Sequence, residues 1–207
     1  MAMLVFRPVE RLQSLGRRSL TARAAVLFCA ALCFASFVWG MIRHFKRPPH
    51  PTPAMIRTAL LGAVCAITQI TSIAIREIRL VIPAIALYIG SLVLFWSAVL
   101  VSRGKLAACG QESVPSELLD SGPYRYVRHP FYLAYNLTWL AGFAATAWWP
   151  LAVAVMVMAT IYEQSARREE AEFLRSELAA AYRQYRRRTG KYVPRLAVSN
   201  EPAQSDR

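Results

Sequence analysis

The sequence predicts an all-α membrane protein: a polytopic bundle of about five transmembrane helices followed by a C-terminal amphipathic helix in the cytoplasm. Of its 207 residues, 56% are hydrophobic and the mean hydropathy is +0.30, whereas soluble domains typically have roughly 45 to 50% apolar residues. The apolar residues form long uninterrupted stretches, and the charged residues lie between and after them. A lipid bilayer is therefore the expected solvent for most of the chain.

Three stretches are long enough to cross a membrane, because roughly 20 helical residues span about 30 Å of hydrocarbon. They are Ala24 to Ile42, Ala54 to Ile75 and Val81 to Ser102. A basic lead, residues 1 to 23, precedes the first stretch and resembles a signal peptide. Further spans follow it, so we expect an uncleaved first helix. The loop Arg43 to Pro53 contains four prolines, which exclude regular helix.

A fourth apolar region, Phe131 to Ile161, is too long for one span and contains Ala147-Trp148-Trp149-Pro150. Proline disfavours helix in the residue before it, and tryptophan favours the membrane interface, so we predict a hairpin that turns there. Five spans is the simplest count. A re-entrant hairpin that does not cross fully is the alternative.

The segment Ser165 to Arg188 has helical periodicity. Apolar and aromatic residues lie on one face and charged residues on the remainder, which predicts one surface helix that extends from the last span. Glycine can adopt a left-handed cap conformation, so the helix should end at Thr189-Gly190. The polar loop 103 to 121 is long enough for a functional lid. The last residues, 197 to 207, are expected to be disordered.

The net charge of +13 is compatible with nucleic-acid binding, but the arginines flank apolar spans, so we expect positive-inside sorting and no nucleic-acid partner. With five spans, the side opposite the N-terminus carries 18 of the 25 basic residues, which places the C-terminus in the cytoplasm. The five arginines before the first span argue against this orientation. The three histidines are dispersed and the four cysteines form no CxxC pair, so no metal site is predicted.

The segment GPYRYVRHPFY, residues 122 to 132, places ionisable and phenolic side chains directly against the fourth apolar region. Polar groups beside hydrocarbon usually have a functional or packing reason. Arg125 and Arg128 can bind a carboxylate or phosphate of a ligand, or equally an anionic lipid. His129-Pro130 can be a helix-entry cap, or can hold an imidazole at the water boundary. Acidic residues Glu163, Glu169, Glu170 and Glu172 follow where the last span ends.

The order of these features is more specific than any one of them. GPYRYVRHPFY, an apolar hairpin, REEAEFL and then YRQYRRRTGKYVP together resemble the isoprenylcysteine carboxyl methyltransferase family, including its prokaryotic members. The resemblance covers roughly Leu118 to Pro194. It implies a helical membrane fold whose C-terminal half, residues 118 to 196, binds S-adenosylmethionine. It also implies methyl transfer to a lipophilic small-molecule or lipidated acceptor that arrives from the membrane lipid.

The resemblance also implies a set of cofactor-binding residues. His129, Pro130 and Tyr132 match the family's HPxY element, and Glu169 or Glu170 corresponds to the glutamate that helps to hold the cofactor. The run that leads into HPxY adds Tyr124, Arg125, Val127 and Arg128.

Three positions depart from the family pattern. Ala134 stands where glycine is usual, and Leu178-Ala179 stands where Phe-Gly is usual. Ala171 stands where a second glutamate is expected. These departures leave open which glutamate faces the cofactor.

Other functions remain open alongside a carboxyl methyltransferase of the inner membrane. The acceptor can be a phospholipid or a small thiol. The chain can also be a membrane reductase that uses NADPH, or a membrane scaffold without catalytic activity. Nothing in the sequence identifies a catalytic residue or a particular acceptor.

Overall fold

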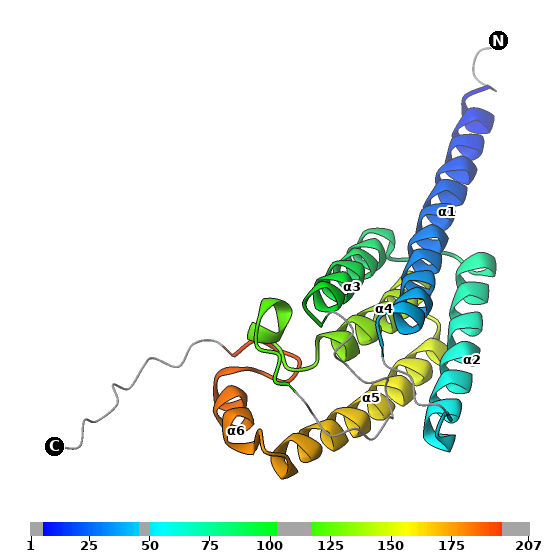
Figure 1. Ribbon diagram of the computed structural model, residues 1–207. Coiled ribbons are helices and arrows are strands. Elements are labelled where there is room, and N and C mark those ends of the chain that lie inside the picture. Colours follow the sequence, from blue (N-terminus) through cyan, green and yellow to red (C-terminus); the bar gives the residue numbers. More distant parts are fainter. Residues whose placement is uncertain (1–5, 46–49, 103–116, 196–207) are drawn as a thin grey trace.

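The computed structural model describes residues 6–45, 50–102 and 117–195, with side chains from Leu20 onward (Figure 1). Over these ranges the chain forms six α-helices and one short 3-10 helix, without a β-strand. The all-α helical bundle is therefore confirmed. The expected lid at 103–116 and the expected disordered tail at 197–207 lie outside the described residues.

The first three long helices contain the three predicted spans. They are α1 (Phe6–Arg43), α2 (Pro53–Ile75) and α3 (Val81–Ser102). Within them, Leu20–Arg43 and the whole of α2 and α3 are long and apolar enough to cross a membrane. From Phe6 onward the basic lead is helical and continues without a break into the apolar part of α1, and this N-terminal part projects beyond the other helices (Figure 1).

The fourth apolar region folds as the predicted hairpin of α4 (Pro130–Thr146) and α5 (Trp149–Arg175). Ala147, at the turn, has a left-handed φ of 51°. At 17 residues α4 is about 26 Å long. Most of α4 is buried, and it lies between α3 and α5 (Figure 1). Neither α4 nor α5 meets the combined criteria of length and hydropathy by which α1 to α3 qualify as candidate spans. Five crossings therefore remain a prediction.

Buried polar side chains join α2, α3 and α4 in the middle of the bundle. Gln69 donates from Nε2 to the Tyr88 hydroxyl at 2.8 Å and to the Thr138 carbonyl at 3.0 Å. Ser91 lies 2.8 Å from the Thr138 hydroxyl. A Cβ added at Gly142 would lie 2.1 Å from Cδ of Gln69, so glycine at this position lets α4 lie this close to the Gln69 side chain of α2. The network fixes the depth of α4 in the bundle.

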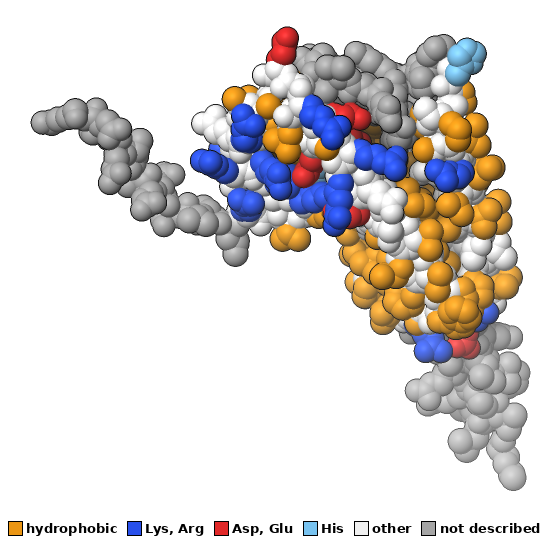
Figure 2. All heavy atoms as spheres, turned by 90° about the horizontal axis from the view of Figure 1, so that it is seen from below, with side chains coloured by type: hydrophobic (Ala, Val, Ile, Leu, Met, Phe, Trp, Pro, Cys, Tyr) orange, Lys and Arg blue, Asp and Glu red, His pale blue; other side chains and the backbone are white. Residues whose placement is uncertain are grey.

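Aromatic packing anchors the start of α4. The Phe95 ring of α3 lies 5.4 Å from the Phe131 ring and 4.9 Å from that of Phe37. Tyr135 packs against Phe37 at 4.8 Å. Outside this core, large apolar side chains cover the surface next to a flank rich in basic side chains (Figure 2). A membrane surrounding the apolar part accounts for this exposure.

The prediction of one tail helix from Ser165 to Arg188 is wrong. The chain bends after α5 and resumes as α6 (Ala179–Arg188). Ser176 causes the break, since its hydroxyl donates to the Phe173 carbonyl at 2.9 Å and accepts from the backbone N–H of Leu178 at 3.2 Å. Such local bonds compete with helix continuation. The bend lets Tyr182 stack on Phe173 with ring centroids 4.7 Å apart.

Candidate functional site

The segment that precedes α4 begins with the 3-10 turn η1 (Gly122–Arg125). Gly122 has φ +56°, a conformation that other residues rarely adopt. His129 is the N-cap residue of α4 and has φ −124° and ψ 64°, outside the α region that a following proline disfavours. Pro130 then opens the helix without the loss of a helical hydrogen bond. The local sequence thus presents His129 at the end of the bundle.

A second segment, the C-terminal strap (residues 189–192), pairs directly with this one. Arg128 donates its backbone N–H to the Gly190 carbonyl at 2.9 Å, and Gly190 donates to Tyr126 at 3.3 Å. The backbone N–H of His129 donates to Lys191 at 3.3 Å. A Cβ at Gly190 would lie 1.7 Å from the Val193 carbonyl oxygen, so the strap requires glycine there. Backbone pairing thus unites two segments that are about 60 residues apart.

Glu170 of α5 lies at the centre of the cluster. Its Oε1 accepts from Arg128 Nε at 3.1 Å and lies 3.1 Å from His129 Nε2. Arg128 also donates to the Thr189 carbonyl of the strap. Burial disfavours the carboxylate, but the His129 and Arg128 bonds outweigh burial and lower the pKa of Glu170 to about 2. Glu170 is therefore a buried anion of α5 that is linked to Arg128 and His129 of the segment before α4 and, through Arg128, to the strap.

Two carboxylates flank His129. Its Nδ1 lies 3.5 Å from Oε2 of Glu169, and the Tyr132 hydroxyl donates to the other oxygen of Glu169. Burial of His129 acts to lower its pKa, but the hydrogen bonds and charges of Glu169 and Glu170 raise the pKa above its ordinary value. The Glu169 side chain is 39% exposed, against 11% for Glu170. Glu169 therefore keeps an accessible carboxylate.

Tyrosine rings form one wall of the cluster. Tyr132 stacks on Tyr162 of α5 with centroids 5.5 Å apart and on His129 with centroids 5.7 Å apart. The Tyr192 ring of the strap lies 6.0 Å from His129. Trp139 donates its indole N–H to the Tyr162 hydroxyl at 3.2 Å, which fixes that ring. The site is thus aromatic on one side and acidic on the other.

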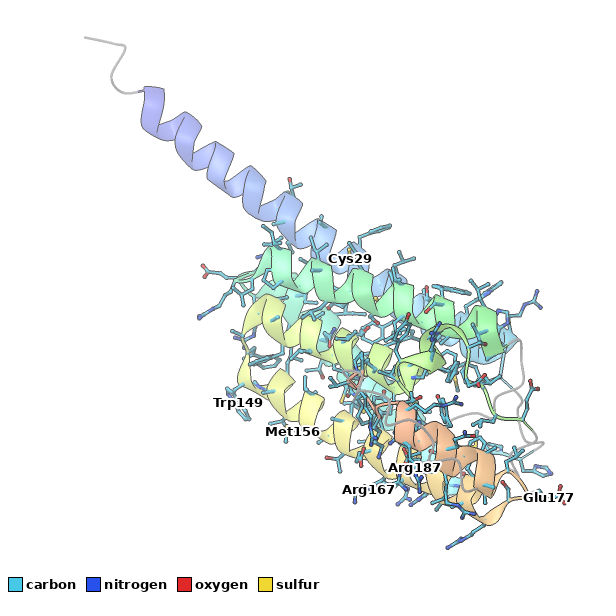
Figure 3. All side chains as sticks on the ribbon, turned by 90° about the vertical axis from the view of Figure 1, so that its left-hand side faces the viewer. Cys29, Trp149, Met156, Arg167, Glu177 and Arg187 are labelled. Atoms are coloured by element: carbon cyan, nitrogen blue, oxygen red, sulfur yellow. The ribbon has the colours of Figure 1, made fainter. Side chains whose placement is uncertain are left out.

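Glu163 fastens the strap to α5. It accepts from Lys191 Nζ at 2.7 Å, from Arg167 Nε at 2.6 Å and from the Tyr192 hydroxyl at 3.1 Å. Partial burial opposes the charge, yet these bonds lower the pKa of Glu163 to about 2. In Figure 3, Arg167 lies at the α6 end of the molecule, and Trp149 marks the other end of α5. The candidate site therefore lies at the charged end of the hairpin.

The structure joins five of the nine predicted cofactor-binding residues through side-chain hydrogen bonds and ion pairs, and the other four take no part in these bonds. Tyr124 is buried, and its hydroxyl has no hydrogen-bond partner among the described residues. Val127 is buried in the backbone bridge to Gly190, and Pro130 serves to start α4. Arg125 is exposed at the end of η1. The residues in contact are Arg128, His129, Tyr132, Glu169 and Glu170.

Sequence reasoning missed two contributors to the site, Tyr162 and Tyr192. Tyr162 belongs to the apolar arm, so its role depends on the side-by-side packing of α4 and α5. Tyr192 reaches the site only through the strap. Glu163 was among the acidic residues noted where the last span ends, and it shares the face of Glu170 because it precedes that residue by two helical turns of α5.

The comparisons with known proteins find one family model, described as "Protein of unknown function (DUF1295)", which matches residues 110–189. The matched segment includes η1, the α4–α5 hairpin and α6. No curated protein and no solved structure matches the chain. The match covers Arg128, His129, Tyr132, Glu169 and Glu170, ends before Gly190 of the strap, and assigns no activity.

Proposed function

We propose that the protein is an integral membrane S-adenosylmethionine-dependent methyltransferase of a lipophilic acceptor, most like carboxyl O-methylation of a prenylcysteine-type substrate. The observation that carries the proposal is the convergence of His129 and Tyr132 with Glu169 and Glu170 at the charged end of an apolar bundle. These residues come from GPYRYVRHPFY and REEAEFL, two of the three segments in which the chain resembles isoprenylcysteine carboxyl methyltransferases.

The chemistry of the cluster fits the cofactor. S-adenosylmethionine carries an ammonium, a carboxylate and a sulfonium, which require an anion, hydrogen-bond donors and aromatic faces. Glu169 offers a carboxylate that is 39% exposed. Tyr132, Tyr162 and Tyr192 offer rings. The buried Tyr124 hydroxyl, which has no partner among the described residues, offers a further polar group.

The two neighbouring glutamates have different roles in this proposal. Glu170 is occupied by Arg128 and His129 and is nearly buried, so it positions these two residues. Glu169 contacts Tyr132 and His129 and remains partly open, so we assign it to the cofactor ammonium. The sequence left this choice open.

When bound, S-adenosylmethionine supplies an electrophilic methyl group. An ionised carboxylate acceptor is already a nucleophile, so the site needs no general base. The protein then contributes position and exclusion of water. Apolar side chains of the hairpin, such as Met156 at 68% exposure, face the surroundings and are compatible with an acceptor that arrives from the bilayer. Because most basic residues lie at this end, we place it at the cytoplasmic face of a bacterial type of inner membrane.

Calorimetry with purified protein in detergent tests the proposal. S-adenosylmethionine should bind, and Glu169→Gln and His129→Ala should each weaken binding about tenfold or more, since each removes a charge-assisted contact. Glu177→Gln is the matched control, because Glu177 is exposed in the turn between α5 and α6 (Figure 3). The absence of binding at millimolar cofactor refutes the proposal, and equal effects of all three changes refute the site.

Two further measurements separate the alternatives. Binding of NADPH in place of S-adenosylmethionine would favour a reductase. Transfer of a radiolabelled methyl group to a membrane extract would distinguish an enzyme from a scaffold and would identify the fraction that contains the acceptor.

A further inference from the structure

One face of α4 leads from the candidate site to the lipid-facing surface. Tyr132, Asn136 and Leu140 are four residues apart, so they lie on the same face at successive turns. Exposure increases along this face: Tyr132 is 5% exposed, Asn136 is half-buried and Leu140 is 40% exposed. From Tyr132 to Leu140 the distance along the helix is about 12 Å.

Asn136 is the polar residue at the middle of this face. Its Oδ1 atom is buried and has no hydrogen-bond partner among the described residues. An unpaired buried amide oxygen destabilises a fold, and in hydrocarbon no water compensates for the missing bond. The buried Gln69 amide of α2, in contrast, donates to both Tyr88 and Thr138. The buried Asn136 oxygen therefore lacks a partner among the described residues, and a ligand head group that it met when the half-buried side chain turned outward would supply one.

The surroundings define what such a ligand contains. Tyr132, one turn toward the site, is bonded to Glu169 and stacked on Tyr162. Leu140, one turn deeper, is apolar and exposed. A molecule lying along this face would place an apolar chain beside Leu140 and its head between Asn136 and Tyr132. Lipids orient in the same sense, with the head at the surface and the chain in hydrocarbon.

We propose that Asn136 recognises the head group of the lipophilic acceptor by accepting a hydrogen bond from an N–H or O–H donor next to the reacting carboxylate. This inference rests on the proposed function and deepens it. It defines the acceptor as an amphiphile with a donor in its head, such as an acylated amino acid. Asn136 is thus a specificity residue and holds no part of the cofactor.

The test compares two amphiphiles that differ by one hydrogen-bond donor. N-dodecanoylglycine carries an amide N–H, and N-dodecanoylsarcosine carries a methyl group in its place. Binding of radiolabelled N-dodecanoylglycine to the full chain in nanodiscs is measured by scintillation proximity, with each unlabelled compound as competitor. Wild type should prefer the N–H compound about five- to tenfold, the value of one hydrogen bond.

Asn136→Leu and Asn136→Ala should both reduce this preference to about one, while binding of S-adenosylmethionine stays unchanged. Gln164→Leu is the matched control, since it makes the same change at an exposed position of α5 and should keep the preference. Thermal unfolding reports whether each variant is folded, and Asn136→Leu should be at least as stable as wild type.

The outcomes separate the two proposals. An unchanged preference in both folded Asn136 variants, or no saturable binding of N-dodecanoylglycine, overturns the inference about Asn136. Loss of the preference in these variants, with no binding of S-adenosylmethionine to wild type, supports the role of Asn136 and overturns the methyltransferase proposal alone.

Discussion

Replacement of Glu170 by glutamine tests the central electrostatic claim about the site. Glutamine has nearly the same shape but no charge, so Arg128 and His129, whose side chains are 7% and 8% exposed, lose their shared anion. The pKa of Glu170 is lowered from 4.5 to about 2, which corresponds to about 3 kcal/mol of native-state stabilisation. Loss of one partner from a buried ion pair costs about 3 to 5 kcal/mol, so the two values agree.

The assay is reversible unfolding in mixed micelles, followed by tryptophan fluorescence at several pH values. Since the folded pKa of Glu170 is below its unfolded value, its contribution is complete above about pH 4.5 and is lost as pH falls toward about 2. Glu170→Gln should therefore lose about 3 kcal/mol at pH 6, and the difference from wild type should shrink with acidification. Glu177→Gln, at an exposed position, is the control. A loss below about 1 kcal/mol, or a difference independent of pH, would refute the reasoning.

Two further predictions concern the bundle and the histidine. Gly142→Ala should destabilise the protein by about 2 kcal/mol or more in thermal unfolding, because the new Cβ displaces the buried Gln69. Gly90→Ala is the control and should be neutral or stabilising, since a Cβ there meets nothing within 4 Å. Equal losses of stability in the two variants would contradict the close contact between Gly142 and Gln69. The raised pKa of His129 means that its stabilising contribution is complete below about pH 6.5 and is lost as pH rises through the folded value. The stability difference between wild type and His129→Gln should therefore decrease from pH 6 to pH 9, with His50→Gln, at an exposed position, as the control; a difference that grows with pH would disprove the assignment.

The spans were predictable because the physics that defines them is local. A bilayer requires long apolar helices, and α2, α3 and the apolar part of α1, Leu20–Arg43, follow the predicted ranges closely. The hairpin turn at Ala147 was predictable for the same reason, since tryptophan and proline mark it directly. The break at Ser176 was not, because serine interrupts a helix only where its side chain bonds to the backbone, and the stacking of Tyr182 on Phe173 stabilises the bend.

The candidate site was predicted only in part, since its geometry depends on contacts between distant segments. His129, Tyr132 and the two glutamates were identified by their residue types and order. The different roles of Glu169 and Glu170 follow from burial and hydrogen bonds, which the sequence does not specify. The sequence placed the strap after the expected helix end at Thr189-Gly190, within YRQYRRRTGKYVP, and its backbone pairing to Arg128 became evident from the fold.

The strap also determines when the site can form during synthesis. Ribosomes release the chain from its N-terminus, so α1 to α4 are available to enter a membrane before residues 189–192 have been made. Arg128 and His129 lack their backbone partners Gly190 and Lys191 until then. The candidate site is therefore assembled last, after the helices that anchor it, and a nascent or prematurely terminated chain would have these helices without the paired strap.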